Sequence, residues 1–194
     1  MPIDLKLIRL KLVETKYEKF LVKNIIRKYH SYVPTHRSVG RRLDWLVYED
    51  MKIIGMIGVG SATYPPSKDM LTHLNINKEG YVKIFNTIGN NWRFCLKYSQ
   101  KNLGTTILKL FRQEAKIEWK KKYDDSLEYI MTFIGNGKSG AVYKADNWKY
   151  VGETAGLPPH KSVSMKWDSA EKLKQKFVKP VGGDYKKLIF LIKL

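Results

Sequence analysis

Apolar residues recur at helical spacing in two long stretches of the chain. In the first stretch Tyr17, Leu21 and Ile25 lie four positions apart, and similar spacing continues over residues 102–122. Residues that repeat every three to four positions share one face of an α-helix. The sequence therefore predicts two amphipathic helices, over 15–28 and 102–122.

Shorter apolar runs, several of them with alternating polar residues, are typical of β-strands. These runs are 3–7, 43–48, 52–59, 91–98, 127–134, 149–153 and 187–194. The second and third are separated only by a short polar link at Glu49-Asp50, which predicts a hairpin. We expect an irregular segment over 61–74 because of Pro65-Pro66, either a strand or a helix over 80–88, and a short helix over 141–147.

The order of these elements predicts an α/β fold with one mixed sheet. Two strands joined by the 102–122 helix, at 91–98 and 127–134, should be parallel with a right-handed crossover. A length of 194 residues suits one domain over 1–194.

Composition narrows the class of protein. Hydrophobic residues make up 43% of the chain, enough for a core, but no run of about 18 apolar residues would span a membrane. The N-terminus lacks the layout of a secretory signal. The one cysteine, Cys95, excludes an intrachain disulfide and a cysteine-rich zinc site, and its strand position predicts a buried thiol. We therefore expect a soluble, cytoplasmic protein with no membrane partner.

The net charge of +18 indicates a polyanionic partner, and DNA is the first candidate. Residues 1–42 hold 11 basic and 3 acidic residues, and residues 160–194 hold 9 and 3, whereas the longer centre is nearly balanced. Basic segments at both ends would contact the phosphate backbone. The alternative is a lysine-rich proteome, although the scarcity of acidic residues does not fit a thermophilic surface.

A short polar segment, 99–106, separates the 91–98 strand from the long helix that follows it. Backbone N–H groups at the start of a helix lack intrahelical partners, and with the helix dipole they form an anion site. The sequence thus predicts a phosphate-bearing ligand there. The candidate binding residues are Asn102, Leu103, Gly104 and Thr105.

This order of elements, with a turn of that kind after the fourth strand, resembles the GCN5-related acyltransferase fold. The turn in that fold reads Arg/Gln-x-x-Gly-x-Gly/Ala and holds the pyrophosphate of coenzyme A. Gly104 matches the last glycine, whereas Asn102 replaces the middle one. Because Asn102 replaces this glycine, acetyl-CoA is a less favoured donor than other molecules.

A second motif narrows the resemblance. Residues Gly140 to Gly152 match Gly-x-x-Tyr-x-Ala-x-Asn-Trp-x-x-x-Gly at every fixed position. This pattern is similar to a branch that contains the phage Mom DNA-modification proteins and the DruA-type proteins of phage defence and transposons. Relatives often carry an Asp after the Thr132-Phe133 strand, where this chain has Gly135-Asn136.

The resemblance implies a DNA-modifying enzyme with an acyltransferase-like fold. Mom-type proteins add a carbamoylmethyl group to N6 of adenine, which protects phage DNA from restriction, and members have been linked to iron. No activity is assigned to DruA-type proteins. The donor is therefore unknown, with iron as a possible cofactor and acetyl-CoA as the less favoured alternative.

Four residues are candidates for catalysis: His30, Tyr32, Arg93 and Tyr143. Arg93 lies in an apolar strand, where it would bind a ligand phosphate or carboxylate, or form an edge ion pair. Tyr143 would act as a general acid or bind iron, or be a core tyrosine. His30, in a loop with Tyr32, would serve as a base or a metal ligand, or do neither.

Six residues are candidates for DNA contact. Arg37, Arg41 and Arg42 would bind phosphates or belong to a solvated face. In the second motif, a flipped adenine would contact Lys144, Asn147 and Trp148. For Asn147 and Trp148 a structural role is favoured instead, with Asn147 as a helix cap and Trp148 as a core aromatic.

The sequence thus favours a Mom-like enzyme on duplex DNA, with Arg93 and residues 102–105 holding the donor. The alternatives are a non-catalytic DNA-binding component of a defence or mobile-element system, and an acetyl-CoA-dependent N-acetyltransferase. The first hypothesis requires the 98–105 bend and Arg93 to face one cavity that they share with Tyr143.

Overall fold

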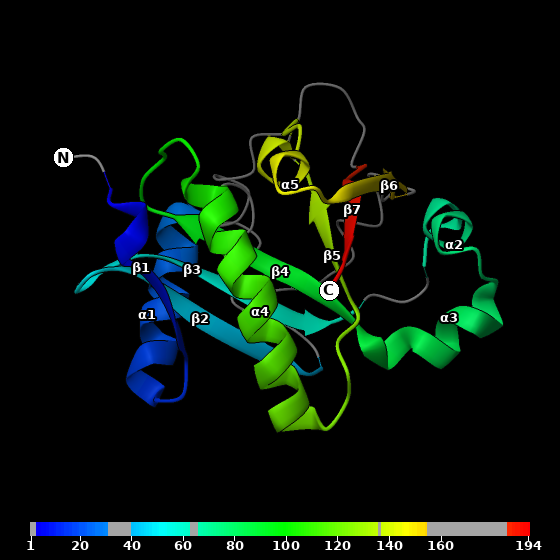
Figure 1. The fold of residues 1–194 in the computed structure, drawn as a ribbon, viewed down its shortest axis with the longest axis horizontal. Helices are drawn as coiled ribbons and strands as arrows, with labels where there is room; N and C mark the ends of the chain where they lie inside the picture. Colours follow the sequence, from blue (N-terminus) through cyan, green and yellow to red (C-terminus); the bar gives the residue numbers. More distant parts are fainter. Residues whose placement is uncertain (1–2, 31–39, 63–65, 136, 155–185) are drawn as a thin grey trace, which may run out of the picture.

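In the computed structural model, seven strands form one sheet in the order β1-β2-β3-β4-β5-β7-β6 (Figure 1). The structure describes residues 3–30, 40–62, 66–135, 137–154 and 186–194. The strands are β1 Ile8–Leu12, β2 Arg42–Glu49, β3 Lys52–Ser61, β4 Ile88–Leu96, β5 Tyr129–Ile134, β6 Lys149–Glu153 and β7 Leu188–Lys193. The helices are α1 Lys16–Tyr29, α2 Lys68–Leu74, α3 Lys78–Ile84, α4 Leu103–Tyr123 and α5 Ala141–Ala145.

Strand directions in the sheet are mixed, as predicted. All neighbouring strands pair antiparallel except β4 and β5, which are parallel, so the predicted parallel unit is confirmed. The β4–β5 pairing covers only three residue pairs, from Ile88 with Tyr129 to Asn90 with Met131. Beyond that point β4 continues beside β3 and β5 beside β7, so the two parallel strands diverge.

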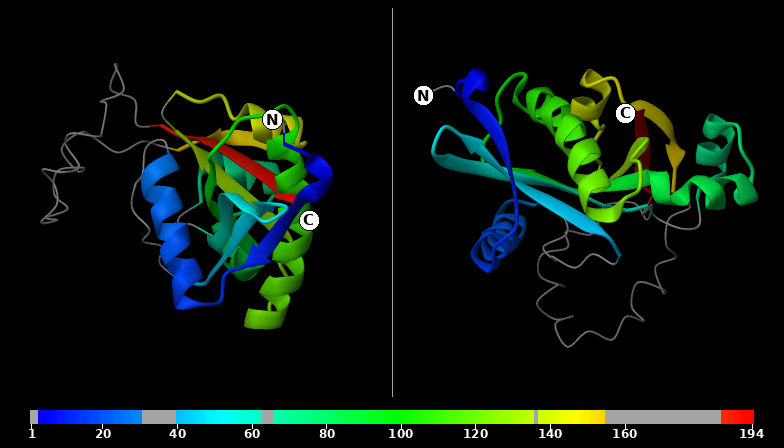
Figure 2. Two further views of the ribbon diagram at one scale, coloured as in Figure 1. Left: turned by 90° about the vertical axis from the view of Figure 1, so that its left-hand side faces the viewer. Right: turned by 60° about the horizontal axis from the view of Figure 1, so that its bottom comes forward.

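The two long helices cover opposite faces of the sheet (Figure 2). On one face α4 buries Phe111 and Trp119 in a cluster with Trp45 of β2. On the other face α1 buries Val22 and Ile26 in a cluster that includes Met56 and Cys95. Both predicted long helices are confirmed, and so is the buried thiol.

A capping box fixes the start of α1. The Thr15 hydroxyl accepts the backbone N–H of Glu18, and the Glu18 carboxylate accepts the N–H of Thr15. That carboxylate also forms an ion pair with Lys11 of β1, at 2.6 Å. The ion pair with the Lys11 ammonium and the backbone donors lower the pKa of Glu18 to about 2. Glu18 therefore ties α1 to the edge of the sheet.

Three local predictions were wrong or incomplete. The predicted strand over 3–7 is a 3₁₀ turn at Leu5–Leu7, because the Asp4 carboxylate accepts the N–H of Lys6; the strand begins at Ile8. Half of the segment predicted as irregular is α2, which Ser67 caps. The ambiguous 80–88 segment lies mostly in α3 and a short 3₁₀ turn, and its last residue begins β4.

No helix in the described part of the chain is long and apolar enough to span a bilayer.

Candidate active site

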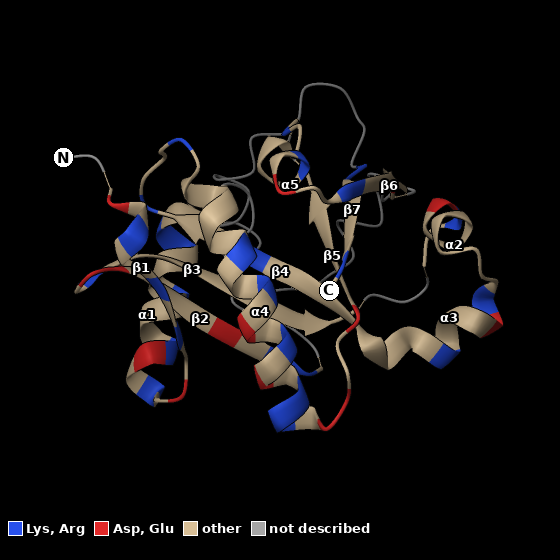
Figure 3. Ribbon diagram, viewed as in Figure 1, with Lys and Arg blue, Asp and Glu red and all other residues tan. Residues whose placement is uncertain are grey.

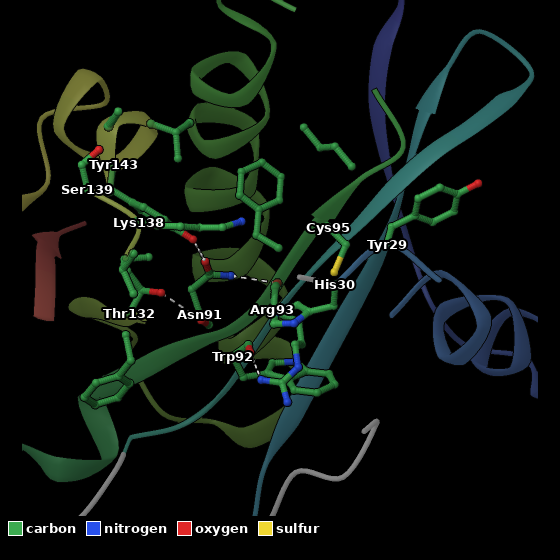
Figure 4. A pocket seen from close by; sticks show the side chains of 17 residues that line it. Tyr29, His30, Asn91, Trp92, Arg93, Cys95, Thr132, Lys138, Ser139 and Tyr143 are labelled. Carbon is green, nitrogen blue, oxygen red and sulfur yellow. Dashed lines mark hydrogen bonds between the residues drawn. The ribbon is translucent and has the colours of Figure 1, made fainter. Parts of the chain in front are cut away.

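A cavity of about 520 Å³ lies where β4 and β5 diverge (Figure 4). Its lining comes from the end of α1, the second half of β4, the end of β5 and the stretch 138–143. Ligand pockets usually measure roughly 300–1,000 Å³. The divergence of the two parallel strands thus provides room for a small ligand in the middle of the sheet.

A β-bulge in β4 shapes one wall of the cavity. Arg93 pairs with Gly58 and Asn91 with Val59, which leaves Trp92 as the extra residue. Neighbouring residues of a regular strand point to opposite faces, and a bulge changes their directions. The bulge lies within the run of β4 residues, 91 to 96, that lines the cavity.

Asn91 joins β4 to the Tyr143 hydroxyl. Tyr143 donates to Asn91 Oδ1 at 2.7 Å, and the Asn91 amide donates to the carbonyl oxygens of Gly58 at 2.9 Å and Arg93 at 3.2 Å. Thr132 of β5 donates to the Asn91 carbonyl oxygen at 3.2 Å. Asn91 thus connects β3, β4, β5 and α5, and it fixes the position of the phenol.

The second sequence motif builds the packing around Tyr143. Gly140 has a φ of +69°, and a Cβ atom there would lie 2.5 Å from the Phe190 ring, so glycine is required on both counts. The Tyr143 ring is 5% exposed and lies 5.0 Å from the Trp148 ring and 6.2 Å from Phe190. The motif therefore holds the phenol rigidly at the cavity wall.

Arg93 stacks over a neighbouring ring. Its guanidinium donates to the Trp92 carbonyl oxygen at 2.6 Å and lies 4.9 Å from the centre of the Trp92 ring, while Arg42 contacts that ring at 3.7 Å. The Trp92 indole donates to Asp44 at 3.0 Å, and Asp44 pairs with Arg42. Arg42 and Asp44 thus fix Trp92, and Trp92 in turn supports Arg93.

His30 lies at the C-terminal cap of α1 and lines the same cavity. Burial lowers the pKa of its imidazole to about 4, and the positive charges of Arg93, Lys138 and Lys187 contribute to this decrease. The imidazole is therefore neutral at neutral pH and can accept a proton. Tyr32, its predicted companion, lies outside the described residues.

The charge around the cavity is one-sided. Arg93 and Lys138 line it, and none of its described lining residues is an Asp or Glu. Burial and the Arg93 charge lower the pKa of Lys187, which also acts on His30. A cavity of this kind favours an anionic group, because no carboxylate in the described lining balances the cations.

The described residues do not fit an iron centre. No group of three or more His, Cys, Asp or Glu converges anywhere among them. Cys95 shares the cavity with His30, but burial raises the pKa of its thiol to about 12. A metal ligand must be deprotonated, so the expectation of iron gains no support here.

The predicted phosphate turn lies outside the cavity lining. Asn102 adopts a φ of +65°, and the Leu103 N–H donates to the Gln100 carbonyl oxygen at 3.2 Å. A Cβ atom on Gly104 would lie 2.4 Å from Val142 Cγ2, so this glycine allows α5 to pack on α4. The Thr105 hydroxyl donates to the Asn102 carbonyl oxygen at 2.9 Å. The predicted ligand-binding role of this turn stays a prediction.

The residues predicted to contact DNA have different environments. Arg41 pairs with Asp125 and Arg42 with Asp44, while Arg37 lies outside the described residues. Trp148 is 3% exposed and donates to Asp146, which agrees with the structural alternative. Lys144 and Asn147 are exposed.

Sequence reasoning missed two cavity residues, Asn91 and Lys138. An asparagine inside an apolar strand run is a signal that a polar group has a partner, and this signal could have identified Asn91. Lys138 lies in a glycine-rich turn and carries no such signal.

The fold is that of the GCN5-related acetyltransferases. Arabidopsis thaliana NAA60 in complex with acetyl-CoA matches with a TM-score of 0.58 at 12% identity, covering 96% of this chain and 98% of that one. The Bacillus subtilis acetyltransferase in complex with CoA matches with 0.53 at 12%, covering 96% and 99%. The ribosomal-protein-S18-alanine N-acetyltransferase of Escherichia coli matches with 0.52 at 8%, covering 96% and 93%.

Within that class, the family model described as Druantia protein DruA matches residues 3–164. The chain therefore belongs to the DruA family. A comparison with curated proteins finds no match.

Proposed function

We propose that this chain is a DNA-modifying transferase that adds a carbamoylmethyl or similar group to N6 of adenine, as Mom-type proteins do. One observation carries the proposal: His30, Arg93 and Tyr143, from segments far apart in the sequence, line one cavity. The net charge of +18 supports DNA as the partner. Membership of the DruA family agrees with a role in phage defence or mobile elements.

The cations of the cavity bind the donor. Arg93 and Lys138 hold an anionic part of the donor, and the apolar rings of Trp92, Phe94 and Phe133 cover its neutral part. The target adenine leaves the base stack to reach this cavity, as in other enzymes that modify a base within a duplex.

His30 and Tyr143 transfer the protons. The adenine N6 atom attacks the electrophilic carbon of the donor, a new N–C bond forms, and the bond from that carbon to the leaving group breaks. His30 is neutral and accepts the proton that N6 loses. Tyr143, which Asn91 holds in place, donates a proton to the leaving group.

Nucleoside mass spectrometry on DNA from cells that express the protein tests this function. We expect a modified deoxyadenosine with the wild-type chain, and about 100-fold less or none with Tyr143→Phe or Arg93→Ala. Tyr150→Phe is the matched control, because Tyr150 is exposed on β6 and lies outside the cavity lining. Unmodified adenine with the wild-type chain, in a host that supports Mom-type activity, overturns the proposal.

A non-catalytic DNA-binding component is the first alternative. The absence of an acidic residue after Phe133 and the glycine-poor turn at 99–106 favour it. If Tyr143→Phe abolishes the biological function while DNA affinity stays intact, this alternative is excluded.

An acetyl-CoA-dependent N-acetyltransferase is the second alternative. Its support is that similar structures contain CoA or acetyl-CoA. Calorimetry with acetyl-CoA decides the question, because this alternative requires micromolar binding. The packing of Gly104 against Val142 leads us to expect none.

A further inference from the structure

The outer face of α1 carries a continuous row of positive charge. Lys16, Lys19, Lys23 and Arg27 are all exposed. At 3.6 residues per turn, they fall within an arc of about 80° and extend over about 16 Å. No acidic side chain in the described part of the chain pairs with them, and Glu18 is engaged with Lys11 on the inner side. We call this row the α1 stripe.

An aromatic side chain lies within the α1 stripe. Phe20 is 56% exposed and occupies the same face as Lys16 and Lys23, and Tyr17 at its edge is 68% exposed. Aromatic rings among cations are common on surfaces that bind single-stranded nucleic acids, and several proteins that bend duplex DNA insert apolar side chains such as Phe between its base steps. The buried residues of α1 are on the opposite side of the helix, so within the described part of the chain these rings do not belong to its core.

The α1 stripe leads to the candidate active site. Arg27 precedes His30 by three residues, about one helical turn, and His30 lines the cavity. A polyanion along the stripe would therefore reach the cavity at its end. In this respect α1 differs from the basic side chains of α4, because no described residue of α4 lines the cavity.

The other long helix also carries lysines, but its charge is mixed. In Figure 3, basic and acidic turns alternate along α4. Three of its basic side chains are paired, with partners of opposite charge at Asp146, Asp124 and Glu118. Lys109 and Lys116 are exposed and have no such partner among the described residues. The helix that carries them, α4, covers the face of the sheet opposite α1 (Figure 2).

We infer that the outer face of α1 binds the phosphate backbone of duplex DNA, with the α1 stripe along the phosphates and Phe20 against the duplex. The inference rests on the proposed function, because it names the surface that delivers DNA to that site. Each phosphate neutralised by a lysine or arginine contributes about −0.9 to the slope of log K against log salt concentration.

Fluorescence anisotropy with a short duplex, measured over a series of salt concentrations without donor, tests the inference. We expect Lys16→Gln/Lys23→Gln to reduce the magnitude of the slope by about 1.8. Lys109→Gln/Lys116→Gln is the matched control, because it removes the same charge at the same spacing from α4, and it should leave the slope unchanged. Phe20→Ala should weaken binding at constant slope.

The outcomes separate this inference from the proposed function. If both lysine pairs change the slope equally, the inference is overturned while the proposed function stands. If the wild-type chain has no salt-dependent affinity for the duplex, both fail. Tyr143→Phe should bind with the wild-type slope, so loss of modification alone counts only against the catalytic proposal. Circular dichroism confirms that each variant is folded.

Discussion

His30 combines two properties that a proton acceptor for adenine requires. It borders the cavity, and its imidazole is neutral because burial and the neighbouring cations disfavour the charged form. The acceptor does not need a high pKa, since N6 becomes strongly acidic once it has formed a bond to the donor carbon. The cations that we propose to bind an anionic donor thus also disfavour the protonated imidazole.

The pKa of His30 can be tested by NMR. We expect its ring proton signals to titrate with a midpoint of about 4, well below the ordinary value of 6.5. Between these two values the unfolded chain binds more protons than the folded one. Stability is therefore complete above pH 6.5 and falls as the pH decreases toward 4. His30→Gln assigns the signal and should remove this part of the pH dependence. A midpoint near 6.5 would contradict the buried, cation-flanked environment.

At the scale of elements, the contact between α4 and α5 links the predicted phosphate turn to the cavity. Val142 lines the cavity on one side and contacts the Gly104 position on the other. The first turn of α4 thus supports the cavity wall through one side chain. In this chain Gly104 serves helix packing, although its place in the sequence matches a phosphate-binding glycine.

A double-mutant cycle measures this contact. Gly104→Ala should destabilise the chain by about 1–3 kcal/mol, because the new methyl group overlaps Val142 Cγ2 and the helix propensity of alanine offsets only part of the strain. In a Val142→Ala background the same change should be neutral or stabilising. Urea denaturation gives both values. Equal effects in the two backgrounds would show that the two side chains do not interact.

Local signals predicted the long elements, whereas partners distant in sequence decided the rest. The helix after Thr15 follows from its spacing and capping residue, and the β2–β3 hairpin from its two apolar runs. The first strand was misplaced because β1 is defined by pairing with β2, which local alternation does not report. An asparagine within the apolar run of β4 indicates that Asn91 has a partner, but the groups that it joins depend on the bulge opposite β3, which the sequence of β4 does not specify.

The two long helices of the molecule lie on opposite faces of one sheet (Figure 2). The cavity lies where β4 and β5 diverge. His30 at the end of α1 and Val142 of α5 both line the cavity, and Val142 also packs on α4. DNA bound along α1, as we propose, would therefore reach the cavity at His30. The sequence predicted the fold class, and it predicted that Arg93, Tyr143 and the 98–105 bend would share a cavity. Arg93 and Tyr143 line the cavity, whereas the described lining includes no residue of the bend. Their proposed roles stay predictions.

The net charge of +18 predicts opposite salt effects with and without DNA. Without DNA, positive charges repel one another in the folded chain, and added salt screens this repulsion, so the melting temperature should rise from 20 to about 300 mM salt. With DNA at about 100 times its Kd, binding adds about 2.7 kcal/mol of stability at low salt. Salt weakens that binding, so the melting temperature of the complex should fall until it meets that of the free chain.

Differential scanning fluorimetry measures the melting temperature against salt concentration with and without DNA. If the melting temperature depends on salt in the same way with and without DNA, the excess charge serves no polyanionic partner. A bound duplex neutralises the positive charge most strongly at low salt, so its effect on the melting temperature must be largest there.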